Sequence, residues 1–238
     1  MPPDMTCRIT PLKWKHLPDV REASCAGKEQ NWKFKGNDLN LFLEKIKQLR
    51  VFPSSALMCA YSWTIFEFIE GETTSINFLL QSNIENLNQI GCFLKSVDVN
   101  TEKPNSCIDR EALVRFQKDF LQSCAENNDK RFDVFEKEFT MDRRFAPLGF
   151  DYYQEVEGHP TKFCDVSLER IYTDTRTTKR YLTLSTKHFP RDSFLNLRFE
   201  YSENVFDSAL IEKVKDRFIL NLRSIINLEL EKGKDKYV

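Results

Sequence analysis

The segment 54–68 is the strongest constraint on the fold, because its side chains are almost uniformly apolar. It follows an amphipathic helical pattern over residues 41–49, which Pro53 separates from it, and it ends near Gly71. A helix without a polar side is buried on most of its surface. The rest of the chain must therefore supply layers that surround this helix.

Alternating apolar residues indicate a sheet beside this helix. The expected strands cover residues 74–80, 90–97, 166–171, 181–185 and 195–201. The expected helices cover residues 41–49, 54–68, 108–125, 132–139 and 207–230. Residues 100–106 are expected to form a polar turn, and residues 189–193 are expected to join the last two strands as a hairpin. The order predicts an α/β chain in which helices pack against a sheet.

The domain boundaries are expected near the two ends. The 238 residues are 41% hydrophobic and 13% aromatic, which suffices for a sizeable core. Residues 1–33 hold four prolines and mixed charge, and we expect an irregular N-terminal arm there. Residues 34–230 are expected to form the domain, and residues 231–238 a frayed tail.

Four segments, in this order, resemble the C-terminal half of condensation domains from nonribosomal peptide synthetases, members of the chloramphenicol-acetyltransferase-like superfamily. They are Ser-Ser-Ala-Leu-Met-Cys-Ala-Tyr at 54–61, Ile-Gly-Cys-Phe-Leu-Lys-Ser at 90–96, Arg-Phe-Asp-Val-Phe at 131–135, and the closing strand and turn at 195–206. The second resembles the family's Ile-Gly-Phe-Phe-Val-Asn-Thr, with Lys95 in place of Asn. The resemblance implies one lobe of a chloramphenicol-acetyltransferase-like fold, which is an α/β chain with a mixed sheet and helices packed on one face.

The resemblance also implies two sites. The residues that correspond to the wall or floor loop of the family's substrate tunnel are Ser82, Asn83, Ile90, Gly91 and Lys95. In the family, carrier proteins dock through an acidic helix, so a basic patch formed by Arg143, Arg144, Arg176 and Arg180, with Arg170 and Lys179 in the same region, is a candidate docking surface for a carrier protein. A solvated charged turn is the alternative interpretation of these basic residues. No cofactor is expected to bind directly, although the phosphopantetheine arm of a carrier protein enters between the lobes in the family.

The family's catalytic base is a histidine in a His-His-x-x-x-Asp-Gly motif, and this chain lacks that motif. The three histidines, His16, His159 and His188, are scattered, and we expect them at the surface, in a turn and at a strand end. Cys164 is the best candidate thiol, although a structural thiol is the simpler interpretation. Nucleotide-binding glycine loops and a Gly-x-Ser-x-Gly elbow are also absent from the sequence.

Three functions remain open. The chain is half of a condensation-type acyltransferase whose catalytic histidine comes from another lobe, or a catalytically inactive module that recruits a carrier protein or partner enzyme, or an independent acyltransferase with a nonstandard base. The expected partners are an N-terminal condensation lobe or a carrier protein. Self-association is also expected, through an apolar face bordered by residues 82–97.

Composition narrows the environment further. The net charge of −1 disfavours nucleic acid and anionic membranes as partners. The longest apolar run is too short and too polar to span a bilayer. Seven cysteines without a Cys-x-x-Cys pair or a recognisable signal peptide predict reduced thiols and a cytoplasmic location. The scattered cysteines and histidines do not predict a metal site.

Overall fold

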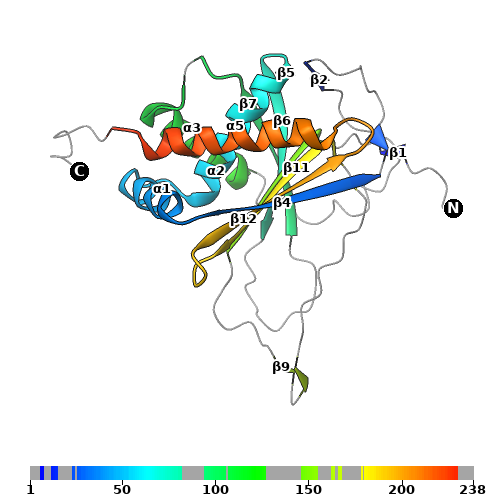
Figure 1. Ribbon diagram of the computed structural model, residues 1–238. Helices are drawn as coiled ribbons and strands as arrows, with labels where there is room; N and C mark the ends of the chain where they lie inside the picture. The colour runs from blue at the N-terminus through cyan, green and yellow to red at the C-terminus, as the bar shows by residue number, and fades with distance from the viewer. Residues whose placement is uncertain are drawn as a thin grey trace.

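Figure 1 shows the computed structural model. It describes residues 6–7, 12–15, 23–24, 26–81, 94–105, 107–126, 146–154, 162–163, 166–167, 178 and 180–229. The structural statements below refer to these residues.

The centre of the fold is a mixed sheet of six strands in the order β4-β12-β11-β8-β6-β7. In chain order these strands are β4 (Gly27–Lys35), β6 (Thr73–Gln81), β7 (Leu94–Glu102), β8 (Leu148–Gln154), β11 (Leu182–Phe189) and β12 (Phe194–Ser202). Strand β8 runs parallel to both of its neighbours, β11 and β6, and all other pairs are antiparallel. The mixed sheet expected from the sequence is confirmed.

Three pairs of two-residue strands lie outside the main sheet. They are β1 (Thr6–Cys7) with β3 (Ala23–Ser24), β2 (Lys13–Trp14) with β5 (Ile69–Glu70), and β9 (Lys162–Phe163) with β10 (Val166–Ser167). The second pair fastens the N-terminal region to the end of the buried helix. Trp14 packs edge-on against Phe206 there, with ring centroids 4.7 Å apart.

Four helices formed by the described residues cover one face of the sheet (Figure 1). They are α1 (Asn37–Gln48), α2 (Pro53–Phe68), α3 (Arg110–Glu126) and α5 (Ser208–Ile226). Local sequence sets their beginnings. Pro53 occupies the first turn of α2, and Asp207 accepts a hydrogen bond from the backbone N–H of Leu210 at 2.7 Å. Asp109 accepts one from Ala112 at the start of α3, also at 2.7 Å. An α/β fold with helices on one face is thus confirmed.

Helix α2 lies in the middle of the helical layer and contacts the other three helices. Its residues Leu57, Tyr61 and Ile65 are fully buried. The Tyr61 hydroxyl donates to the backbone carbonyl of Leu182 at 3.3 Å, and the Tyr61 ring stacks on Phe150 of β8. The nearly uniform apolar composition of this segment therefore corresponds to burial on most of its surface.

Truncation of this helix should destabilise the protein strongly. We expect Leu57→Ala or Ile65→Ala to lower the free energy of unfolding by about 2 to 5 kcal/mol, because each leaves a cavity in a fully buried environment. Leu41→Ala on α1, where the side chain is 39% exposed, is the matched control and should cost less than about 1 kcal/mol. Urea unfolding of the three variants measures the difference. Losses below about 1 kcal/mol at both buried sites would contradict this packing.

Two sequence expectations are wrong. Residues 27–33 belong to strand β4, although they fall inside the segment 1–33 that was expected to be irregular. The strand was missed because it lies at the sheet edge, where charged residues alternate with few apolar ones. Residues 100–102 continue strand β7 instead of forming a turn.

Strand β8 was not predicted at all, because its few apolar residues are followed by polar ones.

The last helix ends at Ile226 rather than residue 230, and the hairpin at 189–193 is confirmed. The expected helix 132–139 and residues 168–171 of an expected strand lie outside the described residues. Within the described residues, no helix is both long and apolar enough to cross a membrane.

Candidate functional site

The face of the sheet opposite the helices is the candidate functional surface. Side chains alternate along each strand, so the register determines which residues share this face. We call it the helix-free face, and it includes Glu29, Asn31, Lys33 and Lys35 of β4, Phe194, Asn196, Arg198 and Glu200 of β12, Thr183, Ser185, Lys187 and Phe189 of β11, Gly149, Asp151 and Tyr153 of β8, Ser75, Asn77 and Leu79 of β6, and Asp98 and Asn100 of β7. Most of these residues are polar, with Leu79, Phe189 and Phe194 as the large apolar exceptions, whereas the helix side of the same strands carries mainly aliphatic and phenylalanine side chains.

A side chain from outside the strands crosses this face. Arg180 precedes β11, and its Nη2 donates to the Asn77 side-chain oxygen on β6 at 2.5 Å. Asn77 in turn donates to Asp98 on β7 at 2.6 Å. A Cβ at Gly149 would lie 3.0 Å from Cδ of Arg180 and 2.6 Å from Oγ1 of Thr183. Gly149 therefore leaves the space through which the arginine passes over β8.

The carboxylate of Asp151 lies next to this arginine on the same face. It accepts a hydrogen bond from the Ser185 hydroxyl at 3.1 Å. Burial raises the pKa of Asp151, and the Ser185 hydrogen bond and the Arg180 charge oppose that shift. Burial also lowers the pKa of Arg180, with Asp151 opposing. Neither group is fully compensated by the other.

Glu200 shows the same electrostatic pattern on β12, which β11 separates from β8. Burial raises its pKa, although Arg198 Nη2 lies 2.6 Å from its carboxylate. Arg180 Nε is buried without a hydrogen-bond partner among the described residues. The helix-free face therefore holds half-buried charges and a buried donor with unused hydrogen-bonding capacity.

Substitution at Gly149 should disturb the packing of Thr183 and Arg180 above it. We expect Gly149→Ala to lower the free energy of unfolding by about 1 to 3 kcal/mol, because the added methyl group overlaps Thr183. Thr183→Ala removes both of the nearest atoms, so the double variant should lose less stability than the sum of the two single variants. A double-mutant cycle by urea unfolding measures this coupling. Strictly additive losses would show that the two residues do not compete for this space.

The raised pKa of Asp151 predicts a pH dependence. The folded state takes up a proton on Asp151 more readily than the unfolded state, so acidification through the folded pKa and down to the ordinary value of about 4 stabilises the native protein relative to Asp151→Asn. Asp151→Asn removes a buried charge and should therefore be more stable than the unchanged protein at neutral pH. This difference in stability should shrink on acidification. Thermal unfolding of both proteins from pH 7 to pH 4 provides the measurement. An advantage that grows on acidification would mean that Arg180 outweighs burial. The part of the Glu200 pKa shift that comes from burial acts in both proteins, and the part that comes from the Asp151 charge is lost in the variant and acts in the same direction.

The structure describes only part of the residues singled out from the sequence. Arg180 lies on the helix-free face, partly buried and bonded to Asn77, rather than extended into solvent. Lys95 pairs with Leu80 in the β6–β7 ladder, with the backbone alone described. The other tunnel, floor-loop and docking residues lie outside the described residues: Ser82, Asn83, Ile90, Gly91, Arg143, Arg144, Arg170, Arg176 and Lys179.

Among the histidines, the structure describes His188, which belongs to β11 and is 9% exposed. It lies on the helix side of the sheet, next to Leu195 in the register. Burial lowers the pKa of His188, and its Nδ1 has no hydrogen-bond partner in the described part of the chain. His16, His159 and Cys164 lie outside that part. Within it, no group of three or more His, Cys, Asp or Glu residues is arranged to hold a metal ion.

Sequence reasoning missed Gly149, Asp151 and Glu200. A polar residue between apolar neighbours in Gly-Phe-Asp-Tyr was a usable signal for Asp151, because alternation places it opposite the core. The space above Gly149 depends on a side chain more than 30 positions away along the chain, which no local pattern reveals.

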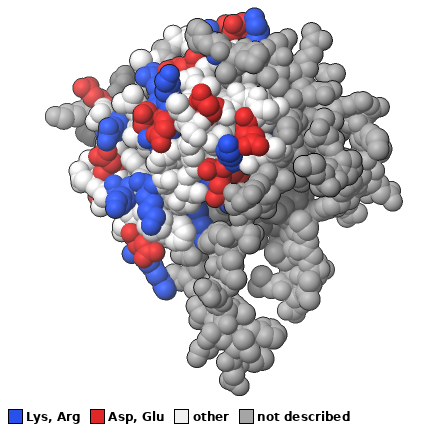
Figure 2. Space-filling model, turned by 45° about the vertical axis from the view of Figure 1, so that its right-hand side comes forward, with Lys and Arg blue, Asp and Glu red and all other residues white. Residues whose placement is uncertain are grey.

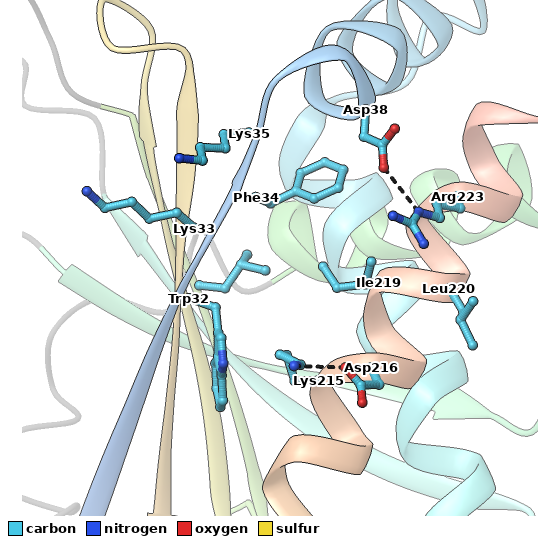
Figure 3. Close-up of a pocket in the computed structure, with 11 residues that line it drawn as sticks. Trp32, Lys33, Phe34, Lys35, Asp38, Lys215, Asp216, Ile219, Leu220 and Arg223 are labelled. Atoms are coloured by element: carbon cyan, nitrogen blue, oxygen red, sulfur yellow. Dashed lines mark hydrogen bonds and ion pairs between the residues drawn. The ribbon is translucent and has the colours of Figure 1, made fainter.

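A groove of about 540 Å³ lies on the helix side of the molecule, between strand β4 and helix α5 (Figure 3). Trp32, Phe34 and Ile219 form its apolar walls. Two ion pairs lie beside it, Arg223 with Asp38 at 3.0 Å and Lys215 with Asp216 at 2.8 Å, and Lys33 and Lys35 also border it. This groove holds no histidine or cysteine. Figure 2 shows basic and acidic residues interspersed over the described surface in that view.

No family model matches the sequence, and no curated protein matches it. Solved structures match in fold. The X-domain from teicoplanin biosynthesis matches 92% of this chain with a TM-score of 0.72 and 13% identity. An X-domain in complex with OxyB, also from teicoplanin biosynthesis, matches 94% with a TM-score of 0.66 and 13% identity. The condensation domain of the Monacolin K polyketide synthase MokA matches 84% with a TM-score of 0.66 and 12% identity.

The chain has the fold of one half of a condensation domain. It spans 51%, 50% and 47% of the three matched chains, respectively. The resemblance seen in four short sequence segments is confirmed at the level of the fold. At sequence identities of 12% to 13%, these matches show a shared fold and do not show a shared activity.

Proposed function

We propose that this chain is half of a condensation-type acyltransferase, which contributes a tunnel wall and floor loop while another lobe supplies the catalytic histidine. The observation that carries the proposal is the helix-free face. One side of the sheet is covered by four helices, and the other carries half-buried charges with unused hydrogen-bonding capacity. A polar surface of this kind suits a second lobe that completes its hydrogen bonds.

The exposed residue Tyr153 also supports the helix-free face as the contact surface for a second lobe. It lies two positions after Asp151 on the helix-free face and is 44% exposed. Tyrosine is frequent among residues that dominate binding, since its ring buries a large area while its hydroxyl still finds a partner. Tyr153 is thus a suitable anchor for a second lobe.

The missing base supports a divided active site. The sequence contains no His-His-x-x-x-Asp-Gly motif, and His188 lies on the helix side of the sheet, away from the helix-free face. In the proposed arrangement the histidine of the other lobe takes the proton from the attacking amine or hydroxyl. The phosphopantetheine arm of a carrier protein enters between the lobes, and residues 82–97 border its path. The proposed location is the cytoplasm, which the cysteine pattern also predicts.

A catalytically inactive interaction module is the second candidate. The observation that favours it is the likeness to an X-domain solved in complex with OxyB, which is a complex between a protein of this fold and another protein. In that case the same face binds a carrier protein or partner enzyme, and no acyl transfer follows. Binding and product formation separate the two functions.

The experiment combines the purified chain with a condensation-domain lobe that carries the His-His-x-x-x-Asp-Gly motif. We expect no product from a carrier-bound thioester with the chain alone, and binding with product formation when both lobes are present. Tyr153→Ala should weaken binding about tenfold. Phe52→Ala is the matched control, because Phe52 is 56% exposed at the start of α2 in the helical layer.

Each outcome points to one function. Binding without product would favour the interaction module. Product from the chain alone, abolished by replacement of His16, His159 or His188, would favour an independent acyltransferase. Equal weakening by Tyr153→Ala and Phe52→Ala would contradict the helix-free face as the contact surface.

A further inference from the structure

Strand β4 forms one edge of the main sheet. Its nine residues pair with β12 along one side, and no strand of the described chain pairs with the other side. An edge strand presents a row of backbone N–H and C=O groups that can pair with a further strand. Nine residues is long for an exposed edge, since natural edges are commonly short or interrupted.

Helix α5 does not close over this edge. The groove of about 540 Å³ separates the helix from β4, and in Figure 3 Trp32 and Phe34 extend toward the groove while Lys33 and Lys35 extend to the other side. The backbone edge lies between these two sets of side chains. A second strand can therefore approach without displacing the helix.

The sequence of β4 is complementary to itself when read antiparallel. A two-fold axis at Asn31 places Gly27 opposite Lys35 of a second copy and pairs all nine residues. On the helix-free face it places Glu29 opposite Lys33 of the second copy, and the symmetry repeats this contact. Opposite charges that face each other across antiparallel strands stabilise the pair.

The charges favour this register over its neighbours. An axis at Gln30 places Lys33 opposite Gly27, and an axis at Lys33 places that lysine opposite its own copy. An axis at Trp32 pairs Glu29 with Lys35 but leaves two residues of each strand unpaired. The axis at Asn31 alone pairs the full strand and satisfies Glu29 and Lys33 together.

Both charged groups are available for this contact. Glu29 is held in place by Asn31, whose amide donates to it at 3.0 Å, and Arg198 lies closer to Glu200, at 2.6 Å, than to Glu29, at 3.8 Å. The Lys33 ammonium lies 4.5 Å from the centroid of the Phe194 ring, on the helix-free face. A lysine on an edge strand opposes pairing with most other strands, so this charge pattern selects a second copy of the same strand.

We propose that two copies of this chain associate through β4, antiparallel about Asn31, into one continuous twelve-stranded sheet. The interface uses the sheet edge, so it goes beyond the proposed function and leaves the helix-free face of β8 and β11 open to a second lobe. A strand-to-strand contact of this size is small, and we expect reversible association at about 10 to 500 µM protein.

The test is sedimentation equilibrium of the full chain and its charge variants. Glu29→Lys and Lys33→Glu each place like charges opposite one another twice, and each should weaken the dimer about tenfold. An equimolar mixture of the two variants should form a heterodimer, because every contact then joins opposite charges. The double variant E29K/K33E should dimerise like the unchanged protein.

Lys35→Glu is the matched control, since it makes the same charge change on the same face but opposite Gly27, and its dimer should match that of the unchanged protein. Circular dichroism confirms that each variant is folded. A protein that stays monomeric throughout the range overturns the proposal. A dimer that is insensitive to both single variants also overturns it. So does a heterodimer of Glu29→Lys with Lys35→Glu but not with Lys33→Glu, because that result would mean that Glu29 faces Lys35.

Discussion

The burial of helix α2 is the constraint on which the other elements depend. An all-round apolar helix has to be enclosed, and here α1, α3 and α5 enclose its sides while the sheet lies beneath it. One of its buried polar groups, the Thr64 hydroxyl, links the helix to α5. Asn221 on α5 donates to Thr64 at 3.0 Å, and Thr64 donates to the carbonyl of Ala60 at 2.7 Å. These bonds fix how α5 lies against α2, and so determine where the helical layer ends above β4.

The placement of all four helices on one side makes the two faces of the sheet different. On the helix side, stacked aromatic rings run from Phe78 through Phe150 to Tyr61, so strands β6 and β8 are fastened to α2. On the other side the same strands carry Asn77, Gly149 and Asp151. Arg180 donates to Asn77 on β6, and its charge interacts with carboxylates on three further strands, Asp98 on β7, Asp151 on β8 and Glu200 on β12. A network of this kind is specific in geometry but is incomplete without further hydrogen-bond partners.

The sequence predicted the parts of the fold in which hydrophobic periodicity is strong. The buried helix, the antiparallel hairpin of β11 and β12 and the final amphipathic helix follow directly from apolar spacing, and the order of four short segments indicated the correct fold. Strands β4 and β8 were missed for different reasons. Strand β4 is an edge strand with Lys28, Glu29 and Lys33 among its residues, and β8 gains its burial from neighbours that are distant in sequence. Periodicity reports which side of an element is buried, and it does not report which strands are adjacent.

The candidate site was less accessible from sequence than the fold. Of the predicted docking residues, Arg180 is described, and its side chain is partly buried on the helix-free face and donates to Asn77. Its environment is assembled from β6, β8 and β11, and the pairing of these strands depends on parallel connections that span tens of residues. A single sequence reports the residue types of such a site but not which of them meet. The structure shows which of them meet. Side chains excluded from the helical core share the helix-free face, and strand register determines which of them are neighbours. Function in a half-fold of this kind therefore follows from the surfaces that the helices leave uncovered.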